Sequence, residues 1–493
     1  MTAKNSTPGT RGLVFREPLL RDLSTEGRRG LDLPPLEVDE VDPGEVLPEW
    51  ALRRAPAELP EVSEPEVVRH FTRLSQWNYS IDTGMYPLGS CTMKYNPRVN
   101  EAMARLPGFA DLHPRTPDRL AQGALELMYE LERFLAEISG LDRVTLQPAA
   151  GAHGELCGVL MMRAWHLRTH GRPRTKVIVP ESAHGTNPAS CAIAGYRVVP
   201  VKNGPDGIVE PAQVAELMDD EVAGFMVTCP NTLGLFERHI GEIAEIVHEA
   251  GGLVYMDGAN LNAILGEARP GDFGVDVMHI NLHKTFSTPH GGGGPGSGPV
   301  AVREDLAPFL PVPVVVQEGD RYRLEYDRPD SIGKMRSFYG NFGVLVRAHA
   351  YIRSLGAEGL KRVAEIAVLN ANYLKERLKE HFHLPFDQPC MHELVLTDKH
   401  QQSFGVKTLD IAKRLIDLGF HPPTVYFPLV VSGALMIEPT ESESKETLDQ
   451  FVDAMVQIAE ECRAEPERLK EAPRRPVRQR LDETRAARNL VLR

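Results

Sequence analysis

The sequence predicts an α/β protein with two parts: a large domain built on a mostly parallel sheet, and a smaller C-terminal α+β domain. Between about residues 125 and 300, short runs of β-branched and apolar residues alternate with helical stretches. The runs are mostly apolar, as expected of strands that helices cover on both faces. From about residue 315 the alternation gives way to longer helical segments with few strands between them.

In the large domain, the first expected helix covers 123–139, where Leu125, Met128, Leu131 and Leu135 recur at helical spacing. A short run at 143–146 precedes a second helix at 156–165. The other expected strands are 176–179, 196–201, 224–228, 252–256 and 276–281, and the other expected helices are 211–220 and 240–250.

The smaller domain is expected to contain long helices within 341–380, helices at 408–418 and 443–463, and strands at 393–396 and 433–437. Residues 1–60 are rich in Pro, Glu and Leu, which indicates an extended arm lying along another surface. A helix start signal, Ser63-Glu64-Pro65-Glu66, follows the arm and predicts a helix to about Gln76. The predicted divisions are an arm at 1–64, a large domain at 65–314, a small domain at 315–463 and a tail at 464–493.

Composition excludes several classes of protein. The formal net charge of −13 argues against nucleic-acid binding, which depends on Lys and Arg. No apolar run is long enough to span a membrane, and the N-terminal residues contain no apolar core of signal-peptide length, so we expect a cytoplasmic protein with no membrane role. No CxxC pair or zinc-like spacing occurs among the cysteines, so no metal site is expected. They are Cys91, Cys157, Cys191, Cys229, Cys390 and Cys462.

The stretch 281–294 carries the strongest chemical signal. Lys284 lies between His283 and Thr285, after an apolar strand and before four consecutive glycines, Gly291 to Gly294. A lysine amine held there can form a Schiff base with a carbonyl, and pyridoxal phosphate is the cofactor most often held in that way. Taken alone, the pattern also fits a surface lysine in a glycine-rich turn, so other parts of a cofactor site are needed.

A phosphate cradle is expected at 148–155, between a short strand and a helix. Small residues, including Gly151 and Ala152, let backbone N–H groups approach a phosphate, and a helix N-terminus adds a favourable partial charge. His153 follows, where an imidazole can stack on a bound ring. The alternative is a tight turn with a capping histidine.

An acid for the pyridine nitrogen is expected at Asp257, which ends a buried strand. A carboxylate there is costly without a partner, and a protonated pyridine nitrogen is such a partner. The alternative is an N-cap for Gly258-Ala259-Asn260. Lys284 follows after one further strand, which places both residues at strand ends of one sheet. A polar cluster at 181–188, which contains Thr186 and Asn187, follows another strand and is expected to contact cofactor or substrate.

The order of these parts is typical of fold-type I pyridoxal enzymes, the aspartate aminotransferase superfamily. Longer stretches resemble one family within it, glycine dehydrogenase (decarboxylating), the P-protein of the glycine cleavage system. The stretches that carry the resemblance are 87–94, 182–190, 257–263, 269–274, 281–286 and 289–295. Tyr95 departs from the family pattern, which has an aliphatic residue there, and Arg98 lies nearby.

The resemblance implies the separate catalytic subunit 2, or β, of a P-protein whose other half is an α subunit in an α2β2 heterotetramer. It implies pyridoxal 5′-phosphate as cofactor, glycine as substrate, release of CO2, and transfer of the aminomethyl group to the lipoyl arm of H-protein. Catalytic roles are expected for Lys284, His153, Asp257 and His283. Cofactor contacts are expected from these four and from Gly151, Ala152, Thr186, Asn187 and Ala259.

Two alternatives remain open from the sequence alone. One is another fold-type I enzyme, either an aminotransferase, which needs an arginine for a second carboxylate, or a cysteine desulfurase, which needs a nucleophilic cysteine. The other is a non-catalytic scaffold subunit that has kept the fold. The presence of both Lys284 and Asp257 argues against the scaffold, because a degenerate copy is expected to lose the lysine.

Overall fold

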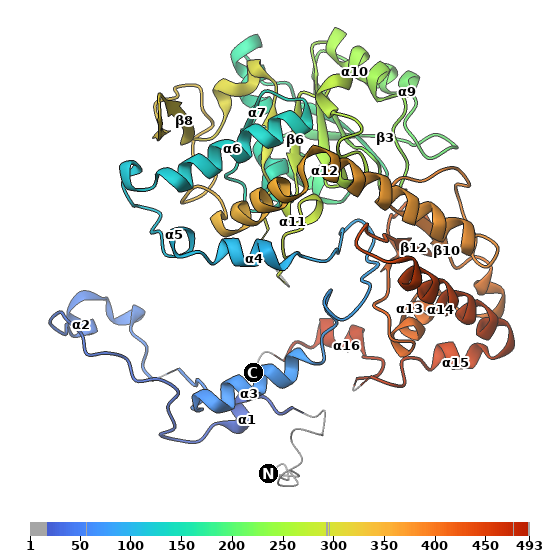
Figure 1. Ribbon diagram of the computed structural model, residues 1–493, viewed down its shortest axis with the longest axis horizontal. Coiled ribbons are helices and arrows are strands. Elements are labelled where there is room, and N and C mark those ends of the chain that lie inside the picture. The colour runs from blue at the N-terminus through green and yellow to red at the C-terminus, as the bar shows by residue number, and fades with distance from the viewer. Residues whose placement is uncertain (1–16, 56, 292–293, 295, 477, 492–493) are drawn as a thin grey trace. The chain divides into compact units, whose positions relative to one another are not determined.

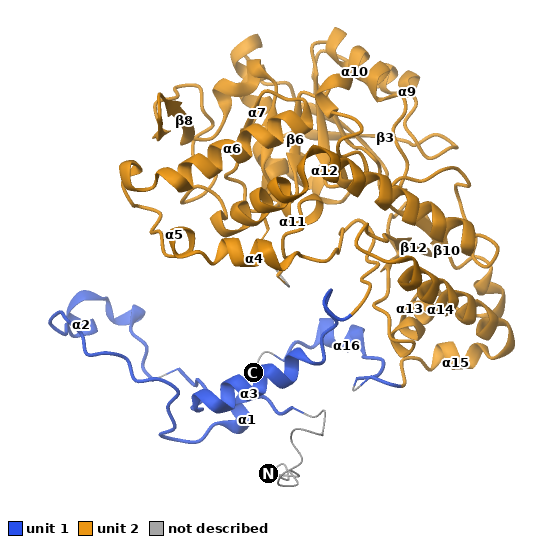
Figure 2. Ribbon diagram, in the orientation of Figure 1, with its two compact units in different colours: residues 1–83, 475–493 blue, residues 84–474 orange. Residues whose placement is uncertain are grey.

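The structure is a computed structural model, and it describes residues 17–55, 57–291, 294, 296–476 and 478–491. The first sixteen residues of the predicted arm, and Gly292 and Gly293 of the glycine run, lie outside the described residues. The chain divides into two compact units, one formed by 1–83 with 475–493 and the other by 84–474 (Figure 2). The predicted domain borders remain predictions, although the second unit begins later than the predicted large domain.

A seven-stranded sheet forms the centre of the 84–474 unit, in the order β1-β7-β6-β5-β4-β2-β3 (Figure 1). All neighbours from β3 to β6 are parallel, and β7 runs antiparallel to both β6 and β1. The mostly parallel sheet that the sequence predicts is therefore present. The strands are β1 (Arg143–Thr145), β2 (Lys176–Pro180), β3 (Arg197–Val201), β4 (Val222–Thr228), β5 (Leu253–Gly258), β6 (Val277–Ile280) and β7 (Val300–Val302).

Helices cover both faces of this sheet because its strands are apolar on both sides. In β5, Leu253 and Tyr255 pack into one apolar cluster with α7, while Val254 and Met256 pack into another with α6, α10 and α12. The helices of this unit up to the sheet's last strand are α4 (Arg98–Ala104), α5 (Pro107–Ala110), α6 (Gln122–Ser139), α7 (Gly151–His170), α8 (Thr186–Ile193), α9 (Pro211–Leu217), α10 (Ile240–Glu249) and α11 (Leu282–Thr285).

The C-terminal part of the same unit has a three-stranded antiparallel sheet, ordered β10-β12-β11. Helix α12 (Phe342–Leu378) leads into it and is interrupted at Gly356, where φ is 64°. The remaining elements are β10 (Leu394–Thr397), α13 (Thr408–Asp417), β11 (Thr424–Val425), β12 (Ala434–Ile437), α14 (Lys445–Ala464) and α15 (Pro466–Lys470). The helices and strands expected here all form.

The sequence analysis missed one hairpin, β8 (Val314–Glu318) with β9 (Arg321–Glu325). Val315, Leu324 and Tyr322 pack against the core that α6 shares with the seven-stranded sheet, so the border expected between 314 and 315 falls inside β8. In β9 polar and apolar residues alternate strictly, which is the signal of a half-buried strand, and the sequence analysis overlooked it. Helix α7 also begins earlier than expected, at Gly151, so most of the predicted cradle lies in its first turns.

The other unit contains α1 (Leu20–Leu23), α2 (Pro43–Val46), α3 (Glu64–Ser75) and α16 (Glu483–Arg488). Helix α3 starts at the predicted signal, where Ser63 and Glu66 form a reciprocal capping box. Apart from α2 and a 3-10 turn at Glu49–Ala51, the described residues of 24–62 form no helix or strand, and the extended arm stays a prediction. Glu17 anchors α3 through Arg73, with Nε–Oε2 at 2.5 Å, and through His70 at 3.0 Å.

Candidate active site

Asp257 and Lys284 lie beyond the carboxyl ends of neighbouring parallel strands. Asp257 is in β5, directly opposite His279 of β6 in the parallel register, and Lys284 is in α11, the single turn that follows β6. The spacing along the chain predicts this arrangement. Loops and helix starts at this edge of an open α/β sheet form the ligand crevice.

The Asp257 carboxylate is buried and fully engaged. Its Oδ1 accepts the Ala259 N–H at 2.9 Å and lies 3.2 Å from His279 Nε2, and its Oδ2 accepts Asn187 Nδ2 at 3.0 Å. Burial acts to raise its pKa, but His279 and the hydrogen bond from Asn187 outweigh burial, so the pKa is lowered. Asp257 therefore stays ionised, as a partner for a protonated ring nitrogen must.

Behind Asp257 lies a second acid, Glu155 of α7. Its Oε2 accepts the same Asn187 Nδ2 at 3.0 Å and the Ser190 hydroxyl at 3.4 Å. Burial and the neighbouring Asp257 charge raise the pKa of Glu155 to about 8. At neutral pH the pair therefore holds one negative charge, located on Asp257.

The raised pKa makes Glu155 a cost to stability at neutral pH. Its folded pKa of about 8 lies above the usual 4.5. The protonated Glu155 side chain therefore makes its full contribution to the free energy of unfolding below pH 4.5, and that contribution is lost as pH rises towards 8. Glu155→Gln, which needs no proton, is therefore expected to raise the free energy of unfolding at pH 7.5 by about 1 kcal/mol or more. Urea unfolding of cofactor-free protein at pH 4 and pH 7.5 measures this. An equal effect at both pH values would contradict the assignment.

Lys284 contacts the 87–96 segment that crosses its turn. Its Nζ donates to the Ser90 carbonyl at 2.6 Å. The buried Lys94 donates to the Thr285 carbonyl at 2.8 Å, and Asn96 donates to Ser287 Oγ at 3.2 Å. The side chains of Lys94 and Asn96 thus hold the turn that carries Lys284, and the Ser90 carbonyl holds the Lys284 amine. All three residues are distant from the turn in sequence.

The start of α7 forms a tight backbone cradle at the same edge of the sheet. A Cβ on Gly151 would lie 2.6 Å from Asn281 Oδ1, so a larger residue would displace the Asn281 side chain. Ala152 and His153 follow in the first turn, and His153 Nδ1 accepts the Ala149 N–H at 3.1 Å. Burial and the nearby Arg336 lower the pKa of His153, which leaves a neutral ring.

The remaining predicted residues lie in two places. Thr186 is the first residue of α8, directly before Asn187. Its Oγ1 lies 2.9 Å from His184 Nδ1. His283 precedes Lys284 and accepts the Ser297 N–H at 3.3 Å, with its ring edge-on to His290. Burial and the two neighbours, His290 and Lys284, lower the pKa of His283 to about 3. It is neutral at physiological pH.

Several site residues were missed by the sequence analysis. His279 sits within an apolar strand, and its only signal is a polar residue at a buried position, where Tyr255 Oη contacts its Nδ1 at 2.9 Å. Glu393 and Glu438 lie more than a hundred residues beyond Lys284 and reach the site only through the fold. Ser90 lies in the 87–94 stretch that carries the family resemblance, but the sequence analysis assigned no chemical role to that stretch.

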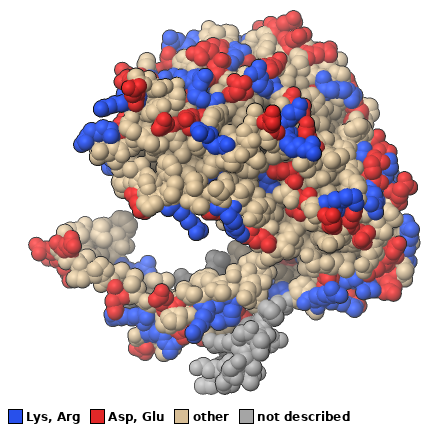
Figure 3. All heavy atoms as spheres, in the orientation of Figure 1, with Lys and Arg blue, Asp and Glu red and all other residues tan. Residues whose placement is uncertain are grey.

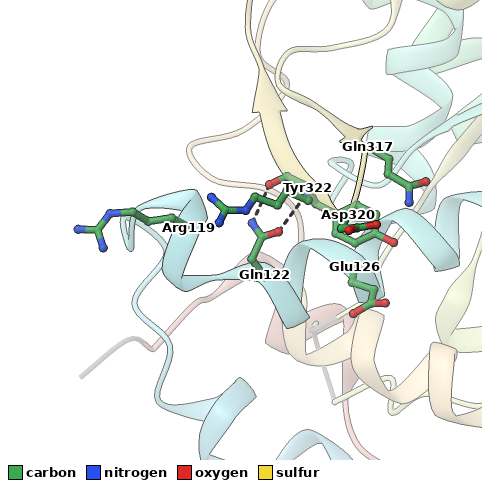
Figure 4. Close-up of a pocket in the computed structure, with 7 residues that line it drawn as sticks. Arg119, Gln122, Glu126, Gln317, Asp320 and Tyr322 are labelled. Atoms are coloured by element: carbon green, nitrogen blue, oxygen red, sulfur yellow. Dashed lines mark hydrogen bonds between the residues drawn. The ribbon is translucent and has the colours of Figure 1, made fainter.

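A polar surface pocket of about 680 Å³ lies elsewhere, between α6 and the β8–β9 hairpin (Figure 4). Gln122 closes one side by bonding both the carbonyl and the N–H of Tyr322, at 2.7 and 2.8 Å. None of its lining residues is a predicted site residue. Lys and Arg are interspersed with Asp and Glu on the face of the molecule in Figure 3.

The residues present fit pyridoxal phosphate. They comprise a lysine amine, a buried ionised carboxylate on the neighbouring strand, and the N-terminus of a 20-residue helix. Three further polar atoms near Lys284 are buried and have no hydrogen-bond partner among the described residues: Thr285 Oγ1, Asn281 Oδ1 and Ser297 Oγ. They are available to bond a cofactor or substrate.

The fold is that of fold-type I pyridoxal-phosphate enzymes. The crystal structure of glycine decarboxylase (P-protein) of the glycine cleavage system, in inhibitor-bound form, matches with a TM-score of 0.71 and 23% identity, over 84% of this chain and 93% of that one. The cysteine desulfurase CsdA from Escherichia coli matches with a TM-score of 0.60 and 16% identity, over 78% of this chain and 97% of that one. At these identities the likeness shows the fold alone.

Sequence comparison narrows the class to one family. Residues 38–324 match the family described as glycine cleavage system P-protein, and 363–479 match glycine dehydrogenase, C-terminal domain. A protein of Caldanaerobacter subterraneus subsp. tengcongensis, named "Probable glycine dehydrogenase (decarboxylating) subunit 2", is 60% identical over 475 residues, 96% of this chain and 98% of that protein. The chain belongs to the P-protein family, as a glycine dehydrogenase (decarboxylating) subunit 2, and the predicted enzyme class is confirmed.

Proposed function

We propose that the chain decarboxylates glycine with pyridoxal 5′-phosphate and passes the aminomethyl group to the lipoyl arm of H-protein. The observation that carries the proposal is Lys284 beside a buried, ionised Asp257 on adjacent strand ends, in a chain of the P-protein family. When bound, the cofactor supplies an electron-withdrawing ring that takes up the electron pair left by the departing carboxylate.

Lys284 would hold the cofactor through Nζ, and Asp257 would face the ring nitrogen. The start of α7, with Gly151 and Ala152, would receive the phosphate, because backbone N–H groups and the helix dipole favour an anion there. His153 would lie against the ring. Its neutral imidazole adds no charge that would compete with the ionised Asp257.

The remaining predicted residues have supporting parts. Ala259 and Asn187 donate to Asp257 and keep its charge in place, at 2.9 and 3.0 Å. Thr186 offers a hydroxyl at the same helix start as Asn187. His283 is neutral and can accept or donate one hydrogen bond to the substrate carboxylate or to the cofactor.

The overall reaction breaks the glycine C–C bond and the lipoyl S–S bond, and forms one C–S bond. Glycine and the disulfide yield CO2, the aminomethyl thioether and one free thiol, and the proton that the thiol gains equals the one that the glycine ammonium group loses. The chain must therefore deliver a proton to the leaving sulfur. The freed Lys284 amine and Glu155 are the candidate proton carriers of this chain, and Glu155 has a pKa of about 8.

A partner subunit is implied because the relatives are named subunit 2. We propose an α subunit in an α2β2 assembly, with the arm as a contact surface. Large apolar side chains of the arm are exposed in this chain, including Trp50 at 87% and Leu33 at 83%. Apolar side chains exposed in such number indicate a covering partner. Among the described residues, no helix is long and apolar enough to cross a membrane.

No observation favours the desulfurase alternative. Five of the six cysteines are buried. Cys91 does lie beside Lys284, next to Ser90, but burial raises its pKa to about 11, so it is a thiol and not the thiolate that a desulfurase needs.

The test is exchange of labelled bicarbonate into the carboxyl group of glycine, with lipoylated H-protein, with and without the α subunit. We expect exchange only when both subunits and pyridoxal phosphate are present. Exchange by this chain alone would support the proposed decarboxylation and refute the requirement for the α subunit. No exchange in a complete assembly that binds the cofactor would refute the proposed function.

A further inference from the structure

Two buried glutamates from the C-terminal part of the chain hold the backbone that faces Lys284. Glu393 precedes β10 and Glu438 follows β12, and both side chains are inaccessible to solvent. Glu393 Oε2 accepts the Ser90 N–H at 2.7 Å. Glu438 accepts both the N–H and the hydroxyl of Thr92, at 2.8 and 2.6 Å.

Ser90 and Thr92 adopt a conformation that they do not favour by themselves. Their φ angles are 57° and 50°, in the left-handed region that costs a non-glycine residue about 1–2 kcal/mol. Such residues persist only where surrounding contacts fix them. Here the contacts include the two carboxyl groups, and the Ser90 hydroxyl also donates to Asn260 Oδ1 at 3.2 Å.

Ser90 also contacts Lys284, through the carbonyl of the peptide that follows it. The Ser90 carbonyl accepts Lys284 Nζ at 2.6 Å, while the Ser90 N–H points to Glu393. Nearby, Gly89 pairs with the edge of β12, where its N–H donates to the Met436 carbonyl at 3.2 Å. A Cβ on Gly89 would lie 2.2 Å from Met436 Cγ, so the segment is seated directly on the small sheet.

We propose that Glu393 and Glu438 are positioning residues for Lys284, which fix the Ser90 carbonyl as the acceptor of the lysine amine when that amine is free. The proposal rests on the proposed function, in which Lys284 is the residue that takes up the cofactor. An acceptor in a fixed position holds the lysine amine in one orientation. The amine therefore reacts faster with the aldehyde of the incoming cofactor.

The charge state of the pair is consistent with this role. Burial and the nearby Glu438 raise the pKa of Glu393 well above its usual range, and burial also raises the pKa of Glu438. His392 lies beside them, with Nε2 3.6 Å from Glu393 Oε1, and burial keeps it neutral. A glutamine at 393 keeps an oxygen acceptor for the Ser90 N–H at nearly the same size, so it is a close mimic of Glu393.

The test measures uptake of pyridoxal phosphate by cofactor-free protein in its complex with the α subunit, followed by stopped-flow absorbance. Borohydride reduction and mass spectrometry then locate the adduct. Glu393→Ala removes the acceptor of the Ser90 N–H, and it is expected to slow uptake about tenfold, the usual effect of leaving one such group unpaired. Glu393→Gln keeps an acceptor and is expected to stay within about twofold of wild type.

Controls separate this effect from instability. Asp398→Ala removes another buried carboxylate of the small sheet, which accepts the Thr408 N–H at 2.8 Å, and it should leave uptake unchanged. Thermal unfolding identifies variants that do not fold. If Glu393→Ala is one of them, Glu393→Asp replaces it, because the shorter side chain withdraws from Ser90 but keeps the acid.

Uptake at the wild-type rate by a folded Glu393→Ala or Glu393→Asp protein would overturn the proposal. So would a Glu393→Gln protein as slow as Glu393→Ala, since the contact with Ser90 would then not be the cause. Lys284→Ala should give no reducible adduct. An adduct in that variant would refute the proposed function itself, whatever the Glu393 variants do.

Discussion

Lys284→Ala is expected to abolish glycine decarboxylation, with a loss of about 10³-fold or more, because no other group at the site can take the place of the amine. Lys284 is the only lysine of the turn after β6, and Lys94, which contacts the same turn, is committed to the Thr285 carbonyl, Tyr351 and Glu441. The bicarbonate exchange assay with the full assembly measures the loss.

Lys284→Arg is the matched variant. It keeps a positive charge that can still donate to the Ser90 carbonyl, but guanidinium does not condense with an aldehyde under these conditions. Both variants should fold, because the turn is fixed by Lys94 and Asn96 and not by Lys284. Normal exchange by Lys284→Ala would refute the mechanism, and activity in Lys284→Arg alone would reduce the role of Lys284 to charge.

Asp257→Asn is expected to have the next largest effect, a loss of about 100-fold in exchange rate. The buried carboxylate is the only charged partner that the site offers to a ring nitrogen, and a hydrogen bond to a charged group contributes roughly 1.5–3 kcal/mol, where about 1.4 kcal/mol is tenfold. An amide there would also turn one donor towards His279 or Ala259. Cofactor affinity and exchange rate should both be measured.

Asp276→Asn is the control for that variant. Asp276 is also buried, precedes the neighbouring strand, bonds a backbone N–H (Val254, 2.6 Å) and contacts a histidine (His248, 2.8 Å). It resembles Asp257 in burial and in these two partners, but it also pairs with Arg303 and is not at the carboxyl end of a strand. We expect Asp276→Asn to lose stability but to keep normal bicarbonate exchange, whereas Asp257→Asn loses exchange. That difference would show that Asp257 acts in the reaction and not only in packing. Equal losses of exchange would contradict the role of Asp257.

Local patterns made most of the fold predictable. Helices α6, α10 and α13 repeat apolar residues at helical spacing, and the sheet strands are continuous apolar runs, so each element is specified by its own residues. Strands β8 and β9 were missed although Arg321–Glu325 alternates polar and apolar residues. Both strands are partly exposed, and their apolar side chains pack against the core beside α6.

The sequence alone determined the parts whose signal is local: Asp257 at the end of a strand, and Lys284 in a turn before glycines. Motif likeness added the family. Tertiary structure decided the rest, because contacts between residues far apart in the chain leave no local pattern. Only the fold brings Glu155 against Asp257, His279 into register with it, and Glu393 to the N–H of Ser90, whose carbonyl accepts Lys284.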